Sequence, residues 1–186
     1  MQVIQGKYRG RKLISPDSAR PTLQRVKQSL FSTIQEYLPE AKCLDLFAGS
    51  GSLGIECISR GANFVSFVEK DNLAVKCIKG NLKNIDTNLY EIIEADYLLA
   101  LKKLSNMGRK YNLVFLDPPY NSNVYISVIE ILERYNLLED EAVIVVESSI
   151  ENNLQLKTKS CIIEKQKEYG SLKITILKKE WYGYSR

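Results

Sequence analysis

The sequence DLFAGSGSLGIE, residues 45–56, decides the fold, because it joins an apolar strand to a helix through closely spaced glycines. Gly49, Gly51 and Gly54 form a G-x-G-x-x-G pattern after the apolar run 43–47 (CLDLF). Glycines at these positions permit a tight turn, close approach of the backbone to a ligand and close packing of helix on strand. The pattern predicts a nucleotide or nucleoside site at the end of this strand, although a small-residue turn in any α/β protein can look the same.

Two carboxylates accompany this glycine loop. Glu69 follows the apolar run 64–68 (FVSFV), where a ribose-binding carboxylate is found in nucleotide-binding βαβ units. Asp45 lies inside the first strand and needs a partner there, either backbone amides of the glycine turn or an amine of a ligand. A carboxylate here would repel a pyrophosphate and attract an ammonium and a sulfonium, which favours S-adenosylmethionine. The loop lacks G-K-[ST], so it is not a phosphate-binding loop for nucleoside triphosphates.

Short apolar runs alternate with helix-length stretches after residue 42. The runs are 43–47, 64–68, 90–94, 112–116 and 142–146, and the stretches between them are 52–60, 71–84, 97–107 and 123–136. This alternation predicts βαβ units and a largely parallel sheet covered on both faces. Residues 161–177 (CIIEKQKEYGSLKITIL) contain two strand-like runs around Gly170, which predicts an antiparallel hairpin at one edge of the sheet.

The beginning of the chain is organised differently. Residues 2–14 predict two short strands around the stretch from Gly6 to Gly10, and Pro21-Thr22 is expected to open a helix. One face of that helix carries an apolar stripe at helical spacing, formed by Leu23, Val26, Leu30, Ile34 and Leu38. At 186 residues the whole chain fits a single domain, and no linker divides it.

Composition excludes several kinds of chemistry. The chain has no histidine, so Ser-His-Asp and Cys-His nucleophiles, HExxH zinc sites and imidazole general bases are ruled out. The net charge of +4 is unevenly distributed, because residues 1–42 hold eight Lys/Arg against three Asp/Glu. A basic segment on a nearly neutral body suggests contact with a polyanion, most simply a phosphate backbone. A solvated basic surface without a partner is the alternative.

The four cysteines, at 43, 57, 77 and 161, form no CxxC pair, and without histidine a zinc site is not expected. They are typical of small buried hydrophobic residues in a reducing compartment. The first residues, MQVIQGKYRG, are polar and basic rather than those of a signal peptide, and no apolar run has the roughly 20 residues of a membrane span. We expect a cytoplasmic protein without metal or membrane.

A second motif, LDPPY at 116–120, directly follows the apolar run 112–116. Two consecutive prolines fix a short extended segment at the end of a strand. In open α/β sheets ligands lie at the carboxyl ends of the strands near the switch in strand order, so Asp45 and Asp117 are expected to share one crevice. A plain loop with a packed aromatic ring is the alternative interpretation.

The glycine loop and DPPY, in this order, resemble class I S-adenosylmethionine-dependent methyltransferases that act on exocyclic amines. The resemblance extends over the whole chain to the family of ribosomal RNA small-subunit methyltransferase D. The further segments are GKYRGRKL at 6–13, RPTLQRVKQSLF at 20–31, Asp96 after the third strand and YGSLKITIL at 169–177. The resemblance implies a Rossmann-like seven-stranded α/β sheet with an N-terminal β-hairpin and helix. It implies one methyltransferase domain, 1–186, made of a basic N-terminal segment, residues 1–41, and a catalytic core, residues 42–180.

The same resemblance implies a reaction: methylation of the N2 amine of a guanine in 16S ribosomal RNA within the small ribosomal subunit, by a monomer that uses S-adenosyl-L-methionine. The catalytic residues it implies are Asp117, Pro118, Pro119 and Tyr120. The cofactor-binding residues it implies are Asp45, Phe47, Gly49, Gly51, Glu69, Asp96 and Asp117. Among these, Asp45 would lie near the ammonium, Glu69 would bind the ribose and Asp96 the adenine amine.

The RNA-binding residues that the resemblance implies lie in the basic N-terminal segment, and they are Lys7, Arg9, Arg11, Lys12, Arg20 and Arg25. For Arg25 a solvated helix face is an equally simple explanation. Tyr120 would stack on a base drawn out of its RNA structure. Because the sulfonium is already activated, positioning supplies most of the catalysis, and no imidazole is needed.

Four other functions compete with this one. DPPY does not distinguish guanine from adenine amines, so adenine-N6 methylation of DNA or RNA is the main alternative, although no separate target-recognition domain is present. Methylation of a protein glutamine fits the basic N-terminal segment less well. A nicotinamide-dependent dehydrogenase would leave DPPY unexplained. A non-catalytic RNA-binding module on a methyltransferase fold would leave the filled site positions unexplained.

Overall fold

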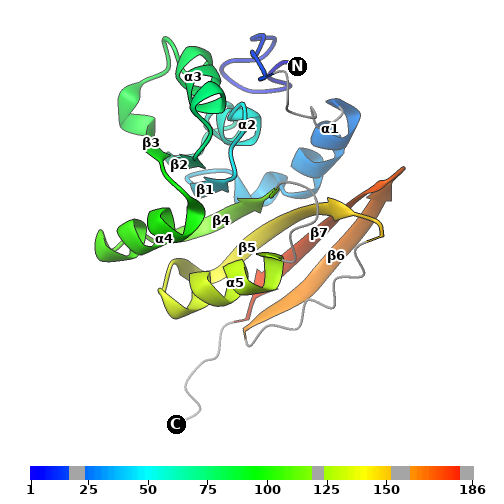
Figure 1. The fold of residues 1–186 in the computed structure, drawn as a ribbon. Helices are drawn as coiled ribbons and strands as arrows, with labels where there is room; N and C mark the ends of the chain where they lie inside the picture. Colours follow the sequence, from blue (N-terminus) through cyan, green and yellow to red (C-terminus); the bar gives the residue numbers. More distant parts are fainter. Residues whose placement is uncertain (17–23, 119–123, 152–159, 181–186) are drawn as a thin grey trace.

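A seven-stranded mixed sheet forms the centre of the computed structural model, which describes residues 1–16, 24–118, 124–151 and 160–180. The strand order is β3-β2-β1-β4-β5-β7-β6 (Figure 1). The strands are β1 (Lys42–Leu46), β2 (Phe64–Glu69), β3 (Tyr90–Glu94), β4 (Tyr111–Leu116), β5 (Leu138–Ser149), β6 (Cys161–Tyr169) and β7 (Leu172–Lys179). The first five run parallel, and β7 pairs antiparallel with both β5 and β6. The predicted α/β sheet with its closing hairpin is confirmed.

Helices cover both faces of this sheet (Figure 1). They are α1 (Gln24–Thr33), α2 (Ser52–Ser59), α3 (Asn72–Asn81), α4 (Tyr97–Asn106) and α5 (Val124–Arg134), with short 3-10 turns η1 (Gln35–Tyr37) and η2 (Thr87–Leu89). Side chains of α1, α2 and α3 join one apolar core, and those of α4 and α5 join the other. None of the helices in the described ranges is long and apolar enough to cross a membrane.

The central strands contribute to both cores, which explains their continuous apolar runs. In β4, Leu113 and Phe115 belong to the core on the α1 face, and Val114 and Leu116 belong to the core on the α4 face. Successive side chains of a strand point to opposite faces. When both faces are covered, every position of the strand is buried, and its sequence is continuously apolar instead of alternating between apolar and polar residues. The strand order also reverses between β1 and β4, and their carboxyl ends are therefore neighbours at a switch point.

The first residues of the chain pack against α2 and α1. Residues 2–14 fold back on themselves, with one antiparallel bridge between Gln2 and Lys12 in place of the two expected strands. Gly6 is required here: its φ is +88°, and a Cβ would lie 1.7 Å from the Ser59 carbonyl oxygen. The apolar stripe is buried as predicted at Val26, Leu30, Ile34 and Leu38, but the helix ends at Thr33, so Ile34 and Leu38 flank the 3-10 turn η1 instead of continuing the helix. Leu23 lies outside the described residues.

Candidate active site

The glycine loop turns sharply as it leaves β1. Phe47 has a φ of +69°, Gly49 of +55° and Gly51 of +74°, and Gly51 caps the N-terminus of α2. A positive φ costs a residue with a Cβ roughly 1–2 kcal/mol, so Phe47 is held in an unfavourable conformation by the structure around it. Its ring lies 5.3 Å from that of Tyr97, at the start of α4. The loop is thus tightly specified from the end of β1 to the start of α2.

Two glycines of the loop meet different surroundings. A Cβ on Gly54 would lie 2.3 Å from Cε1 of Phe67, so this glycine allows α2 to pack closely on β2. A Cβ on Gly49 would meet no atom of the described structure within 4 Å. Among the described residues, Gly49 therefore borders open space, where a ligand can approach the backbone.

Glu69, at the end of β2, holds the glycine loop from the other side. Its Oε2 accepts a hydrogen bond of 2.8 Å from the Gly49 amide. Its Oε1 accepts hydrogen bonds from the amides of Lys70 and Asp71, at 2.8 and 2.9 Å. The carboxylate is thereby fixed beside the loop at the position where the sequence predicted a ribose partner.

Asp45 is a buried carboxyl group near the end of β1, just before the glycine loop, with 3% of the residue exposed. Its Oδ2 accepts a hydrogen bond of 2.9 Å from the Gly54 amide, which is the glycine-turn partner anticipated from the sequence. Burial raises the pKa of Asp45 to about 7, and the nearby charges of Asp117 and Glu69 add to the increase. A carboxyl group with this pKa gains a great deal from a cation placed next to it.

Asp117 follows β4 directly, next to the end of β1. Asp45 and Phe115 are register partners in the β1–β4 pair, so Asp117 lies just beyond Asp45 on the neighbouring strand. Burial raises the pKa of Asp117 to about 6. Pro118 is buried. The other two residues of the predicted DPPY site, Pro119 and Tyr120, lie outside the described residues.

Asp96 lies at the same edge of the sheet, two residues after β3. It is the N-cap of α4, and its Oδ1 accepts a hydrogen bond of 3.0 Å from the Leu98 amide. Because β3 pairs with β2 through Glu94 and Glu69, the predicted ribose and adenine contacts lie on adjacent strand ends. The described cofactor positions thus line up along the ends of β3, β2, β1 and β4.

Three residues that support the glycine loop, Lys27, Glu56 and Asn81, were not predicted from the sequence. Lys27 of α1 is fully buried, and its Nζ donates to Ser52 Oγ at 2.8 Å and pairs with Glu56 Oε2 at 3.0 Å. Asn81 of α3 donates to the Ser50 carbonyl at 2.9 Å. Lys27 lies on the apolar side of its helix, and Glu56 is the one charged residue in SLGIECIS, so both were detectable as charges at core positions.

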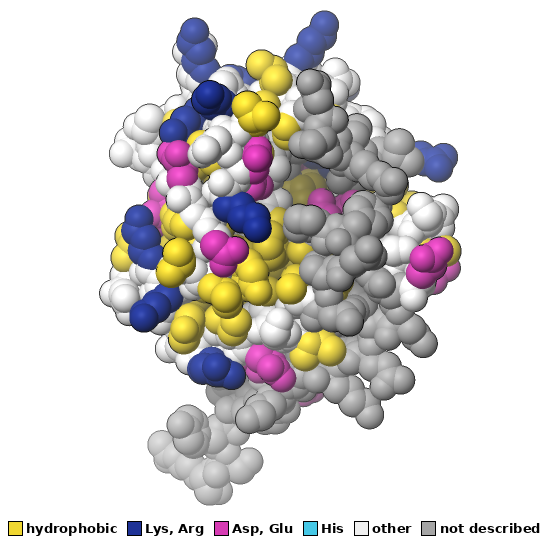
Figure 2. Space-filling model, in the orientation of Figure 1, with side chains coloured by type: hydrophobic (Ala, Val, Ile, Leu, Met, Phe, Trp, Pro, Cys, Tyr) yellow, Lys and Arg dark blue, Asp and Glu magenta, His cyan; other side chains and the backbone are white. Residues whose placement is uncertain are grey.

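The predicted RNA-binding residues are mostly at the surface. Lys7, Arg9, Lys12 and Arg25 are exposed, whereas Arg20 lies outside the described residues. Arg11 is half-buried and donates from its guanidinium to the Lys83 carbonyl, so some of its hydrogen-bonding capacity is already used. Figure 2 shows Lys and Arg side chains projecting from the upper end of the molecule, where Figure 1 places the N-terminal residues beside α3.

The side chains at these strand ends suit a cationic nucleoside. Among the described residues, open space at Gly49 leaves room against the backbone, and two carboxyl groups with raised pKa values, the buried Asp45 and the half-buried Asp117, favour positive charge next to them. A dinucleotide pyrophosphate would bring negative charge to the same place. The residues present therefore fit S-adenosylmethionine, which carries an ammonium and a sulfonium.

Known proteins resemble this chain over its whole length. A family model described as "Conserved hypothetical protein 95" matches residues 1–178. "Ribosomal RNA small subunit methyltransferase D" of Escherichia coli (strain K12) is 34% identical over 100% of this chain and 93% of its own length. The protein of the same name from Haemophilus influenzae is 39% identical over 80% of this chain and 78% of its own length.

Solved structures agree with the fold. "Putative methyltransferase yhhF from Escherichia coli" is 32% identical, covers 97% of this chain and 98% of its own, and has a TM-score of 0.86. "Crystal structure of SMU.776, a putative methyltransferase complexed with SAH" is 14% identical, covers 83% of this chain and 48% of its own, and has a TM-score of 0.70. At that identity the second likeness concerns the fold alone, which is that of a class I methyltransferase.

Proposed function

The chain belongs to the family of ribosomal RNA small subunit methyltransferase D, and from this we propose that it transfers a methyl group from S-adenosylmethionine to the N2 amine of a guanine in 16S ribosomal RNA. One observation carries the proposal beyond family membership. The glycine loop and Asp117 meet at the neighbouring carboxyl ends of β1 and β4, with the buried carboxyl group of Asp45 between them.

The cofactor-binding residues of this proposal are those along the four strand ends. Gly49 and Gly51 would border the methionine moiety, Asp45 would attract its ammonium, and Glu69 and Asp96 would contact the ribose and the adenine. S-adenosylmethionine, when bound, supplies a methyl group already activated by its sulfonium. The protein needs to supply mainly orientation, which suits a chain without histidine.

The methyl acceptor would be held by the segment after β4. The guanine N2 lone pair is delocalised into the ring, so the amine is a poor nucleophile. Hydrogen bonds from its two N–H groups to the Asp117 carboxylate and the Pro118 carbonyl would favour a pyramidal nitrogen with its lone pair directed at the methyl group. With a pKa of about 6, Asp117 is mostly ionised near pH 7 and can also take up the proton released after transfer.

The proposal also covers the form of the RNA substrate and the oligomeric state, domain organisation and location of the protein. We infer that a monomer acts in the cytoplasm on the assembled small subunit, as a single domain that joins the basic N-terminal segment to the catalytic core, residues 42–180. The exposed Lys7, Arg9 and Lys12 support an RNA-facing role for the basic N-terminal segment, because exposed amines and guanidinium groups attract phosphates. For Arg25, exposure on α1 fits both RNA contact and a solvated face.

The decisive experiment is radiolabelled methyl transfer to unmethylated small ribosomal subunits, free 16S ribosomal RNA and DNA, followed by nucleoside analysis. We expect N2-methylguanosine, and faster transfer to the subunit than to free RNA. Recovery of N6-methyladenosine would overturn the proposal that guanine N2 is the methyl acceptor. Faster transfer to free RNA would overturn the proposal that the assembled subunit is the preferred substrate.

A pair of variants tests the division of roles. Asp117→Ala is expected to reduce turnover far more than S-adenosylmethionine affinity, because this carboxylate is proposed to hold the acceptor amine and Asp45 remains beside the cationic cofactor. Glu69→Ala is expected mainly to weaken cofactor binding, since Glu69 fixes the glycine loop. Equal effects of both variants on turnover and on calorimetric cofactor affinity would contradict the assignment.

A further inference from the structure

The edge strand β6 carries a basic surface that the proposed function has not yet used. Before a β-bulge, Ile163 pairs with Leu177; after it, Lys165 pairs with Ile176. Leu177 belongs to the core on the α4 face, and Ile176 to the core on the α1 face. The extra residue at the bulge therefore redirects Lys165 and the residues at every second position after it, Lys167 and Tyr169, toward α1.

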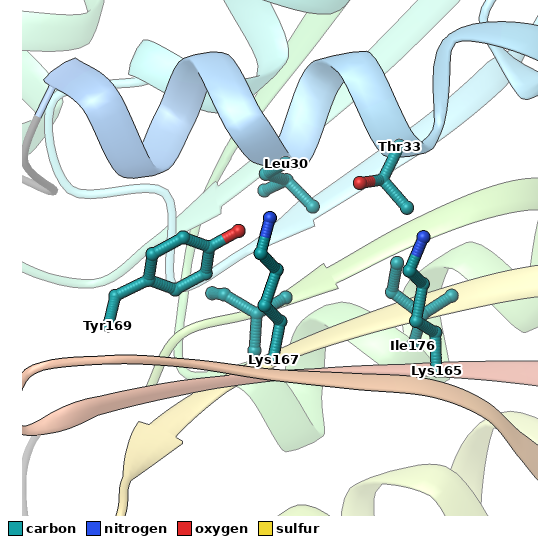
Figure 3. Close-up of a pocket in the computed structure, with 7 residues that line it drawn as sticks. Leu30, Thr33, Lys165, Lys167, Tyr169 and Ile176 are labelled. Atoms are coloured by element: carbon teal, nitrogen blue, oxygen red, sulfur yellow. The ribbon is translucent and has the colours of Figure 1, made fainter.

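A small pocket opens between these side chains and α1 (Figure 3). Lys165 and Lys167 both rise from β6 toward the helix, with Lys165 near Thr33 and Lys167 beside Tyr169 (Figure 3). Lys167 Nζ donates to Ser29 Oγ at 3.1 Å and lies 5.3 Å from the centre of the Tyr169 ring. The Tyr169 hydroxyl lies 2.6 Å from the same Ser29 Oγ. Two amines and several hydroxyl groups thus face one small space.

The amines of this pocket are exposed and available to an anion. Neither Lys165 nor Lys167 forms an ion pair with a carboxylate within the described residues. Acidic side chains line only the adjoining hollow, where Glu36 and Glu164 lie beyond Lys165 and Glu164 accepts a hydrogen bond from Tyr37. The Lys167 end of the pocket is thus its most positive end, and it also offers the hydroxyl groups of Ser29 and Tyr169.

We propose that Lys165 and Lys167, with Ser29 and Tyr169, bind phosphate groups of the RNA strand that flanks the target guanine. The inference rests on the proposed function and adds a second RNA contact, whose two charges, on Lys165 and Lys167, are remote in sequence from the basic residues of the N-terminal segment. A lysine ammonium with neighbouring hydroxyl donors suits a phosphate oxygen, which accepts several hydrogen bonds at once.

The sheet places this pocket in register with the acceptor site. Lys167 of β6 pairs with Ile174 of β7, and Ile174 pairs with Glu147 of β5. The preceding residue of β5, Val146, pairs with Leu116 of β4, so Glu147 is level with Asp117, the residue after Leu116. Lys167 is therefore level with Asp117 along the strand direction. Three strand spacings of about 4.8 Å separate β4 from β6, or about 14 Å in all, a distance that a few nucleotides can span. A strand bound at Asp117 can thus reach the pocket along the carboxyl edge of the sheet.

The test combines Lys165→Gln with Lys167→Gln, which removes two charges and keeps a long polar side chain at each position. The control, Lys102→Gln with Lys103→Gln, removes two exposed charges from α4 on the opposite face. Binding to unmethylated small ribosomal subunits is measured between about 50 and 200 mM KCl. We expect the test variant to bind on the order of tenfold more weakly at the low end, with a salt slope reduced by about 0.7 per lysine. Cofactor affinity and turnover at saturating RNA should stay unchanged.

Two outcomes would overturn the inference. One is a salt slope equal to that of the control variant. The other is unchanged RNA binding together with self-association, which would make these lysines protectors of an edge strand. Failure of the proposed function gives a different result, because the unmodified protein would then neither methylate nor bind the small subunit.

Discussion

At the scale of single residues, the ionised Asp45 carboxylate lowers the stability of the folded protein but favours the binding of a cationic ligand. Its pKa in the folded protein is about 7, above the ordinary value of 3.8, and burial is the main cause. The folded state therefore binds this proton more tightly than the unfolded state does. The associated stability is fully present below about pH 4 and is lost as the pH rises toward 7. A cation bound beside the ionised group compensates for that loss.

The first prediction follows from this titration. Affinity for S-adenosylmethionine should fall about tenfold between pH 8 and pH 6, because protonation of Asp45 competes with the cationic ligand. Calorimetry on Asp45→Asn should show weaker binding with little of this pH dependence. In Asp117→Asn the dependence should persist with a lower midpoint, because the Asp117 charge helps to raise the Asp45 pKa. An unchanged pH dependence in Asp45→Asn would contradict the assignment.

Two glycines of the loop give the second prediction. Gly54→Ala should destabilise the fold by about 1–3 kcal/mol, because its Cβ would collide with the Phe67 ring. Gly49→Ala should lose about 1 kcal/mol from its positive φ, and its larger effect should be on cofactor affinity, since its Cβ would enter the space beside the loop that the described residues leave open to a ligand. Urea unfolding and calorimetry measure the two effects. Equal losses of affinity in both variants would refute the distinction.

At the scale of elements, helix α2 connects the basic N-terminal segment to the glycine loop. Glu56 is its central residue: Oε2 accepts from the Ile4 amide and Oε1 from the Gln5 amide, at 2.9 and 3.0 Å. The same carboxylate pairs with Lys27 and with Arg60, at 3.0 and 2.8 Å. Burial alone would raise the pKa of Glu56, but Lys27, the Ile4 amide and Arg60 outweigh it and lower the pKa. The charged group thus joins three segments.

The third prediction separates these partners. Glu56→Gln should cost about 3–5 kcal/mol of folding free energy, because it leaves the buried Lys27 without its counter-charge. It should also release the first residues of the chain, since an amide offers one acceptor oxygen where two backbone amides need partners. Hydrogen exchange at Ile4 and Gln5 should then accelerate beyond what global unfolding explains. Lys27→Met keeps both carboxylate oxygens of Glu56 as acceptors, so exchange at Ile4 and Gln5 should rise only as far as the loss of global stability requires. An equal additional increase in exchange at these two amides in both variants would contradict the role of Glu56 in holding the first residues of the chain.

The sequence allowed most elements to be predicted, because their signals are local. β1 to β4 match apolar runs to within a residue or two, and the glycine loop was placed correctly at the start of α2. β5 begins at Leu138 rather than at 142, because its added residues Glu139, Asp140 and Glu141 are partly solvent-facing and give no apolar signal. The Lys27–Glu56 pair and the β6 bulge were not predictable, since each depends on partners brought together only by the fold.

At the scale of the whole molecule, the basic residues proposed to contact RNA lie on two separate surfaces. One is the basic N-terminal segment, where Lys7, Arg9 and Lys12 are exposed beside α2 and α3. The other is the β6 pocket, at the far edge of the sheet from β2 and β3. The sequence distribution of charge indicated only the first, because the lysines of β6 are flanked along the chain by Glu164 and Glu168. The pleat turns Glu168 to the other face of the strand, whereas Glu164 lines the hollow next to Lys165, so the lysines reach the pocket mainly at its Lys167 end.

The last prediction concerns how these two surfaces act together. If one RNA substrate spans both, their contributions to binding free energy should be additive, because residues far apart without shared partners act independently. Arg9→Gln with Lys12→Gln should lower the salt slope by about 0.7 per residue, and combining it with the β6 pair should double the reduction. A double-mutant cycle on unmethylated small subunits measures this. If the combined variant reduces the salt slope no more than the stronger of the two pairs does alone, the two surfaces bind RNA in alternative modes. The proposal that one RNA spans both surfaces along the sheet edge would then be wrong.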